Sequence, residues 1–483
     1  MSRWRPSLGA LLLVLGLVLG ACQSPSTPGL TSPPIPSPEA ASAHDAPSLG
    51  VADLATLPQD PAFYLAQPGV RAWTLDPARQ REMAQRFRQE FFAPWRQEAP
   101  SQTREQVRQD FLDFLQGLGY GEDHWPHDRA WLQGLLDYAG LENYPNQGYA
   151  GISLGPANLR SLPTRHLLLD GFAHPGQGYA FDNLQQSLMP PNTPLYVVHA
   201  SRDKAWLLCD SPYGLWWMAA DKVARAGPAL RQAWKRAPLA ALVADHVALN
   251  ERRGAHLFSA GIGAVFPLVR QDAQGLEVLA AVGRDGQARS RRVRLSRGQA
   301  RPWPLALSSL ALARQAAPML NQPYGWGGSF GNRDCSALMK DLFTPFGLWL
   351  PRNSTEQAHE GGRFMPLGRL EPAERERLLL AQGVPWLTLV WRPGHIMLYL
   401  GAYQGRALVL HSLWGLKTSD GQGREGRQVI GRSVITSLHA GEELPHLARP
   451  EALLLNRVEG MTLLAPSADL RWSTPDLAVP SVH

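Results

Sequence analysis

Cysteine is scarce in this 483-residue chain, which has only three: Cys22, Cys209 and Cys335. A strong excess of charge is missing too, because 47 basic residues face 41 acidic ones and leave a formal charge of +6. That small excess suits a polyanionic surface such as a cell wall but is far below what nucleic-acid binding requires. The content of 18% charged and 44% hydrophobic residues is typical of a globular protein. The length predicts three or four domains.

Clusters of metal ligands are not seen either. His124 and His127 are separated only by Trp125-Pro126, but no cysteine or group of acidic residues accompanies them. We therefore interpret both histidines as loop residues. No motif in the chain requires a metal or another cofactor.

Long apolar runs are also few, and the run at residues 8–19 is too short to span a membrane comfortably. It follows Arg3 and Arg5 and ends in Leu19-Gly20-Ala21-Cys22, which looks like a bacterial lipoprotein box. We predict a signal peptide at 1–21, with Cys22 as the lipidated first residue of an exported protein anchored on the periplasmic face of an outer membrane. An ordinary secretory signal, with Cys22 incidental, is the alternative.

The amino-acid composition changes twice in the next segments. Residues 22–48 are rich in Ser, Pro and Ala and predict a tether that cannot bury a core. Residues 49–154 show helical periodicity: Asp76-Pro77 is a typical helix start, and Met83, Phe87 and Phe91 recur every four residues after it. We predict a helical domain here.

Short β runs separated by turns follow, at 193–200, 205–210, 215–219, 265–270, 276–282 and 288–295. They fall into two sets and predict two small barrels, at 155–228 and 229–303. Seven arginines between Arg284 and Arg301 gather around the last hairpin. They form either a solvated face or a patch that faces glycan or lipid.

The chain is organised around a Gly-rich loop, at 325–331, that leads into a helix whose first residue would be Cys335. Glycine permits the φ > 0 turns that a cleft floor needs. At a helix N-terminus the free N–H groups and the dipole favour a thiolate, so Cys335 is a candidate nucleophile. Cys209 lies within an apolar run and is interpreted as a buried core residue. A Cys209–Cys335 disulfide is the alternative, and it would abolish the nucleophile.

A thiol nucleophile needs a base, and the base needs an orienting group on its other ring nitrogen. His395 begins one predicted strand and His411 lies in the next, so they fill these roles. Both imidazoles must then lie on one face of the hairpin. Side chains alternate along a strand, so this parity predicts a three-residue loop, Tyr403-Gln404-Gly405, in place of a two-residue Gln404-Gly405 turn.

These residues resemble the NlpC/p60 cell-wall cysteine peptidases, which have a papain-like α+β core. The matching pieces are Tyr324-Gly-Trp-Gly-Gly, Asp334-Cys335-Ser336, Leu350-Pro-Arg-Asn-Ser354 with Gln357, Gly394-His395 and His411. The resemblance implies a multidomain protein in which a helical domain and two bacterial SH3-type barrels precede a peptidase domain at 304–465. A tail at 466–483 would follow.

The resemblance also implies a substrate, a peptidoglycan peptide or muropeptide cut between the γ-carboxyl of D-glutamate and a diamino acid, meso-diaminopimelate or lysine. In the matching branch a free N-terminal L-alanine is held by residues that correspond to Tyr324, Asp334, Ser336 and Ser354. In that branch an acidic and an aromatic residue of the first barrel close the site, and Asp182 and Tyr213 are the candidates. A non-catalytic wall-binding lipoprotein and an acyltransferase or amidase on the same core are the alternatives.

Overall fold

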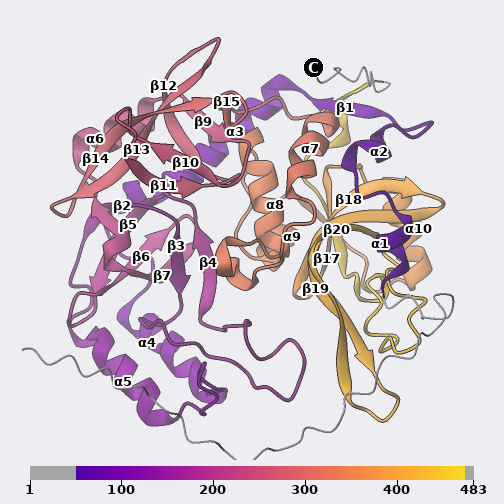
Figure 1. Ribbon diagram of the computed structural model, residues 1–483, viewed down its shortest axis with the longest axis horizontal. Coiled ribbons are helices and arrows are strands. Elements are labelled where there is room, and N and C mark those ends of the chain that lie inside the picture. The colour runs from indigo at the N-terminus through magenta and orange to yellow at the C-terminus, as the bar shows by residue number, and fades with distance from the viewer. Residues whose placement is uncertain (1–49, 474–483) are drawn as a thin grey trace, which may run out of the picture. The chain divides into compact units, whose positions relative to one another are not determined.

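The computed structural model describes residues 50–473 (Figure 1). The predicted signal peptide, the whole predicted tether and the predicted lipidation site Cys22 lie outside the described residues. Within 50–473, no helix combines the length and the apolar character needed to cross a bilayer. Cys209 and Cys335 are both buried free thiols, so the alternative of a disulfide between them is not realised.

Three longer helices form the N-terminal region, and each begins at a capping residue. Helix α3 (Pro77–Phe91) starts at Asp76, whose carboxylate accepts from the N–H of Ala78, and α4 (Arg104–Asp113) starts with a Thr103–Gln106 capping box. Helix α5 (Arg129–Ala139) follows Asp128 and ends at a left-handed Gly140. The predicted helical domain is therefore present, with its helices in the expected segments.

The first part of that region packs on the C-terminal domain instead. Helices α1 (Ala52–Thr56) and α2 (Pro61–Leu65) are followed by β1 (Ala72–Leu75), which pairs with β22 (Leu470–Ser473). Tyr64 and Trp73 are buried in the same cluster as the helix that carries Cys335. The apolar residues of both ends thus extend the peptidase core, so part of the predicted tail is an ordered strand.

The two barrels share one twelve-stranded sheet in the order β15-β9-β12-β13-β14-β8-β2-β5-β6-β7-β3-β4, and β10 and β11 of the second barrel pair in a separate two-stranded sheet. The first barrel contains β2 (Tyr149–Ser153), β3 (Ala157–Arg160), β4 (Gln185–Met189), β5 (Pro194–Ala200), β6 (Trp206–Ser211), β7 (Gly214–Ala219) and β8 (Val223–Arg225). The second contains β9 (Leu239–Leu242), β10 (Val247–Asn250), β11 (His256–Ala260), β12 (Val265–Asp272), β13 (Gly275–Arg284), β14 (Gln287–Ser296) and β15 (Ala300–Trp303), after helix α6 (Pro228–Arg236). All six predicted β runs are strands.

Three of the seven arginines around the last hairpin are neutralised by close ion pairs. Arg291, Arg292 and Arg294 pair with Glu251, Glu277 and Asp272 respectively. Because these guanidinium groups already have carboxylate partners, the hairpin is better described as a solvated ion-pair face than as a patch for an anionic surface.

The C-terminal domain places helices against a six-stranded antiparallel sheet of order β16-β21-β17-β18-β19-β20 (Figure 1). The strands are β16 (Arg363–Pro366), β17 (Thr388–Arg392), β18 (His395–Tyr403), β19 (Arg406–Ser419), β20 (Glu425–Ser437) and β21 (Gly460–Leu463). The helices are α7 (Ser309–Ala316), α8 (Cys335–Phe343), α9 (Ser354–Glu360) and α10 (Pro372–Gln382). Helix α8 packs on β18 and β19 through Leu338, Met339 and Leu342, which brings its first residue to the start of β18.

Candidate active site

The Gly-rich loop that precedes the candidate nucleophile lies against strand β4 of the first barrel. Gly327 (φ 55°) and Gly328 (φ 83°) adopt left-handed backbone, and a Cβ on either would collide with the backbone of β4. Gln185 of β4 donates from Nε2 to the carbonyl of Gly327 at 3.0 Å. The first barrel therefore buttresses the loop that leads into the thiol.

Cys335 is the first residue of α8, which Asp334 caps by accepting from the N–H of Ala337 at 2.8 Å. Its side chain is buried, and the backbone N–H of Ile396, the residue after His395, acts to lower the pKa of the thiol. Burial raises the pKa of the thiol to about 12, and the nearby Asp334 carboxylate adds to this rise. The sequence-based expectation of a resting thiolate is therefore wrong, because desolvation outweighs the helix terminus.

His395 and His411 are hydrogen-bonded, with 2.9 Å between Nε2 of His395 and Nδ1 of His411. Nε2 of His411 lies 3.1 Å from Oγ1 of Thr436, and that hydroxyl donates to the carbonyl of Ser437 at 2.9 Å. Since the hydroxyl has one proton, Thr436 accepts from Nε2–H of His411, and Nδ1 of His411 accepts from Nε2–H of His395. The chain of bonds thus leaves Nδ1 of His395 as a bare lone pair.

Both imidazoles are neutral in the resting protein. Burial lowers the pKa of His411 to about 3. Burial also lowers the pKa of His395 far below its ordinary value, and the neighbouring His411 and Arg392 lower it further. The site therefore holds a neutral thiol next to a neutral base.

The strands reach this arrangement by a route that the sequence analysis did not predict. The loop has two residues, because Tyr403 pairs with Arg406 and both Gln404 (φ 51°) and Gly405 (φ 80°) are left-handed. The predicted three-residue loop is wrong. A β-bulge between Tyr399 and Gly401 then shifts the register by one residue, so Leu398 pairs with Leu410. The bulge supplies the change in parity that puts both imidazoles on one face.

Asp334 and Ser336, two predicted substrate contacts, are engaged with Arg352. This buried guanidinium donates from Nη2 to Asp334 Oδ2 at 2.6 Å and from Nη1 to Ser336 Oγ at 2.8 Å. Asp334 also accepts from the N–H of Gly327 at 3.1 Å. Burial alone would raise the pKa of Asp334, but the Arg352 charge holds it below the ordinary value. Its carboxylate thus orders the site and has no free charge for an ammonium group.

Tyr324 and Ser354 retain free hydroxyl groups. Neither side chain forms a hydrogen bond with another described residue. Burial raises the pKa of Tyr324, and the charges of Cys335 and Asp334 raise it further. Ser354 is the half-buried first residue of α9. Both residues remain available to a substrate.

The two predicted barrel residues lie at the interface with the peptidase domain but have structural partners. Asp182 is buried and pairs with Arg160 at 2.6 Å, while its backbone carbonyl accepts from Trp326 Nε1 at 3.0 Å. Tyr213 stacks on Trp349, and Lys340 Nζ lies 5.0 Å from its ring centroid. Phe181, next to Asp182, contacts the rings of Tyr324, Trp326 and Trp414. The barrel thus contributes Phe181 to an aromatic cluster with three residues of the peptidase domain, and Asp182 contributes its backbone carbonyl.

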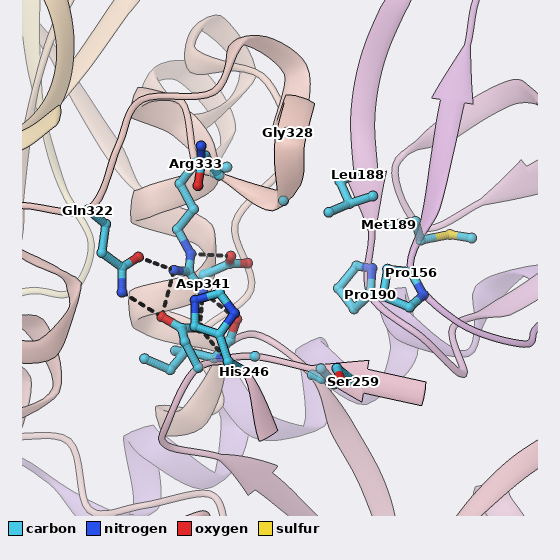
Figure 2. Close-up of a pocket in the computed structure, with 18 of the residues that line it drawn as sticks. Pro156, Leu188, Met189, Pro190, His246, Ser259, Gln322, Gly328, Arg333 and Asp341 are labelled. Atoms are coloured by element: carbon cyan, nitrogen blue, oxygen red, sulfur yellow. Dashed lines mark hydrogen bonds and ion pairs between the residues drawn. The ribbon is translucent and has the colours of Figure 1, made fainter. Parts of the chain in front are cut away.

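A separate cavity of about 320 Å³ lies between the barrels and α8 (Figure 2). Arg333 dominates it and donates to Asp245 at 2.7 and 2.9 Å and to Asp341 at 2.7 Å. Lys340 also pairs with Asp341, so two cations balance two carboxylates, and we interpret the cavity as an interdomain packing feature. Residues 50–473 contain no cluster of His, Cys, Asp or Glu side chains that could hold a metal ion.

Two residues that the sequence analysis did not assign prove to be central. Thr436 lies two strands away from His395, and Arg352 was noted in a motif without a role. Thr436 pairs directly with Val409 across β19 and β20. Val409 and His411 are two residues apart on β19 and share one face, so only this long-range pairing brings Thr436 to the face of His411. No local signal in the sequence marks that position.

Helix α8, the sheet and this set of side chains are the parts of a papain-like hydrolase core. Four family models match the chain: "NLPC_P60 stabilising domain, N term" at 11–144, "SH3 domain (SH3b1 type)" at 168–219, "SH3 domain of SH3b2 type" at 230–273 and "NlpC/P60 family" at 321–420. Together these matches span more than half of the chain. The chain therefore carries a C-terminal NlpC/P60 domain, preceded by the N-terminal stabilising domain found with NlpC/P60 domains and by two SH3b domains.

Among solved structures, an NlpC/P60 endopeptidase from Photobacterium damselae subsp. piscicida is 26% identical, with a TM-score of 0.76 over 84% of this chain and 97% of that one. An NlpC/P60 family protein from Bacillus cereus ATCC 10987 is 15% identical, with a TM-score of 0.41 over 59% of this chain and 83% of that one. No curated protein matches the chain.

Proposed function

We propose that the protein is a cysteine endopeptidase that cleaves the amide between the γ-carboxyl of D-glutamate and a diamino acid in peptidoglycan peptides. The observation that carries this proposal is the bonded chain from His395 through His411 to Thr436, together with the packing of the Cys335 helix on β18 and β19, the strands that carry both histidines. The similarity to an endopeptidase that covers nearly its whole length supports the reaction class.

In this mechanism the thiol and the base exchange one proton. Nδ1 of His395 takes the proton of Cys335 as the sulfur attacks the γ-carbonyl carbon. The imidazolium then gives the proton to the leaving amine, and a thioester remains on Cys335. Water, deprotonated by the same nitrogen, releases the D-glutamyl product and restores the thiol.

The neutral resting pair fits this sequence of steps. A thiol whose pKa is raised to about 12 does not ionise before substrate binds, so proton transfer accompanies the attack. His411 holds His395 in the tautomer whose Nδ1 is free. The backbone N–H of Cys335, at the start of α8, is the first donor to the oxyanion, and such a donor is typically worth ~3 kcal/mol.

The substrate contacts are assigned to the groups that remain free. Tyr324 and Ser354 offer hydroxyls to the peptide, and the aromatic cluster of Phe181, Trp326 and Trp414 joins the first barrel to the peptidase domain beside Tyr324. The other predicted residues act indirectly. Asp334 and Ser336 hold Arg352, and Asp182 holds Trp326 through its backbone carbonyl. Tyr213 joins the first barrel to the peptidase domain.

The location of the protein forms part of the same proposal. The apolar run at 8–19 and the sequence before Cys22 support export, lipidation of Cys22 and anchoring at the periplasmic face of an outer membrane. Expression with labelled palmitate would test this: label should enter the wild-type protein and be absent from Cys22→Ala.

The experiment that tests the reaction is incubation of the purified protein with defined muropeptides, followed by mass spectrometry of the products. The proposal expects L-Ala-D-Glu and a fragment that begins with the diamino acid. An acyltransferase on the same core would give products whose masses include the acceptor, and a wall-binding protein would leave the peptides intact.

A further inference from the structure

Arg392 lies beside the catalytic base. It ends β17 and is the direct cross-strand partner of His395 in the β17–β18 ladder. Directly opposed residues of antiparallel strands project from the same face, with Cβ atoms about 4.5–5.5 Å apart. The guanidinium charge contributes to the low pKa of His395, after the larger effect of burial.

This guanidinium has no partner. Its Nε is buried without a hydrogen bond, and no residue within 50–473 forms an ion pair with it. The other buried arginines around α8 differ, because Arg352 pairs with Asp334 and Arg333 pairs with Asp245 and Asp341. A partly buried cation without a partner is costly, so its presence beside a nucleophile indicates an anionic ligand.

The surrounding charges strengthen this indication. Burial lowers the pKa of Arg392, and the exposed Arg457 lowers it further. Arg457 likewise has no acidic partner among the described residues. Two cations that form no ion pair with a described residue therefore lie on the side of His395 that faces β17.

The chemistry of the leaving group selects the ligand. The proton of His395 must reach the leaving amine, so the leaving residue lies next to His395 and within reach of Arg392. Resting on the proposed function, we propose that Arg392, assisted by Arg457, binds the distal carboxylate of the leaving diamino acid and makes the enzyme selective for diaminopimelate over lysine. Diaminopimelate ends its side chain in both an ammonium and a carboxylate, whereas lysine ends in an ammonium alone, which two arginines would repel.

The test compares two peptides that differ only at this residue, L-Ala-γ-D-Glu-meso-diaminopimelate and L-Ala-γ-D-Glu-L-Lys. The wild-type enzyme should cleave the first with a kcat/KM higher by roughly 10- to 100-fold, the value of a charge-assisted hydrogen bond. Arg392→Gln should remove most of that preference by slowing cleavage of the diaminopimelate peptide, and Arg392→Lys should keep part of it. Arg406→Gln, at the opposite end of the β18–β19 hairpin, is the matched control and should leave the preference unchanged.

Binding to the Cys335→Ala variant, measured by calorimetry, separates recognition from effects on the base. Adding Arg392→Gln to that variant should weaken binding of the diaminopimelate peptide and leave the lysine peptide unaffected. If Arg392→Gln slows both peptides equally and shifts the pH profile, the guanidinium acts on His395 and the inference is overturned. If the wild-type enzyme cleaves both peptides equally, the inferred selectivity is overturned and the proposed function stands. If it cleaves neither peptide, the proposed function is overturned as well.

Discussion

Replacement of Thr436 by valine tests whether the Thr436 hydroxyl, acting through His411, sets the tautomer of the base His395. The hydroxyl of Thr436 lies 3.1 Å from Nε2 of His411, and both residues are fully buried at 0% exposure. Valine has nearly the same shape but cannot accept the proton of Nε2. The N–H would then lack a partner in a site that water does not reach, which costs ~1–3 kcal/mol.

His411 can avoid that cost by moving its proton to Nδ1. It would then donate to Nε2 of His395 and leave the proton of His395 on Nδ1, where the base must be free. A change of ~1–3 kcal/mol in this tautomer equilibrium corresponds to roughly 5- to 150-fold. We therefore expect kcat to fall by roughly that factor, with KM unchanged because Thr436 lies behind His411 and away from the cleft.

Steady-state kinetics on a diaminopimelate peptide measures both constants, and circular dichroism checks the fold. Thr436→Ser is the control, because it keeps the hydroxyl and loses only a methyl group. If Thr436→Val retains wild-type kcat, or if Thr436→Ser loses as much activity as Thr436→Val, the hydroxyl does not set the tautomer.

Three further predictions follow from the same site. Iodoacetamide should alkylate Cys335 slowly at pH 7 and faster as the pH approaches 10, with Cys209 unlabelled, because burial raises both thiol pKa values; rapid labelling at pH 6 would show a resting thiolate. The pKa of His411 is lowered to about 3, so the unfolded chain binds a proton that the folded one does not, and stability falls as pH drops below ~6.5. The loss in unfolding free energy from pH 7 to pH 5 should be ~2 kcal/mol smaller in His411→Gln, measured by urea denaturation, and an unchanged loss would refute a neutral His411. Acetylating the N-terminal amine of a peptide substrate should change kcat/KM by less than about threefold, because Asp334 and Asp182 are already paired, and a loss of 30-fold or more would reveal an ammonium site.

The sequence alone predicted the architecture and the residues that meet at the site. Helix caps, β runs and turn residues are local signals, so the helices, the two barrels and the start of α8 at Cys335 were within reach. Because a base must be oriented by a second group, the sequence analysis predicted that His395 and His411 are neighbours. In the structure, Nε2 of His395 lies 2.9 Å from Nδ1 of His411.

What the sequence did not predict depends on contacts between distant segments. The bulge near Gly401 (φ 120°) changes the strand parity, and the loop-based argument contained no information about it. The pKa of Cys335 depends on how deeply the first barrel and β18 bury it, which the helix N-terminus alone does not reveal. The state of the two charged side chains also depends on the fold. Only the folded structure shows that Asp334 has an ion-pair partner and that Arg392 has none among the described residues.

The central claim is that Cys335 forms a thioester with the γ-carboxyl of D-glutamate in a peptidoglycan peptide. The most direct measurement is rapid acid quenching of the enzyme during turnover of L-Ala-γ-D-Glu-meso-diaminopimelate, followed by mass spectrometry of the intact protein and its peptides. The mechanism predicts an L-Ala-D-Glu adduct on the peptide that contains Cys335, with no adduct and no cleavage in Cys335→Ala. Cleavage of the same bond by Cys335→Ala would contradict it.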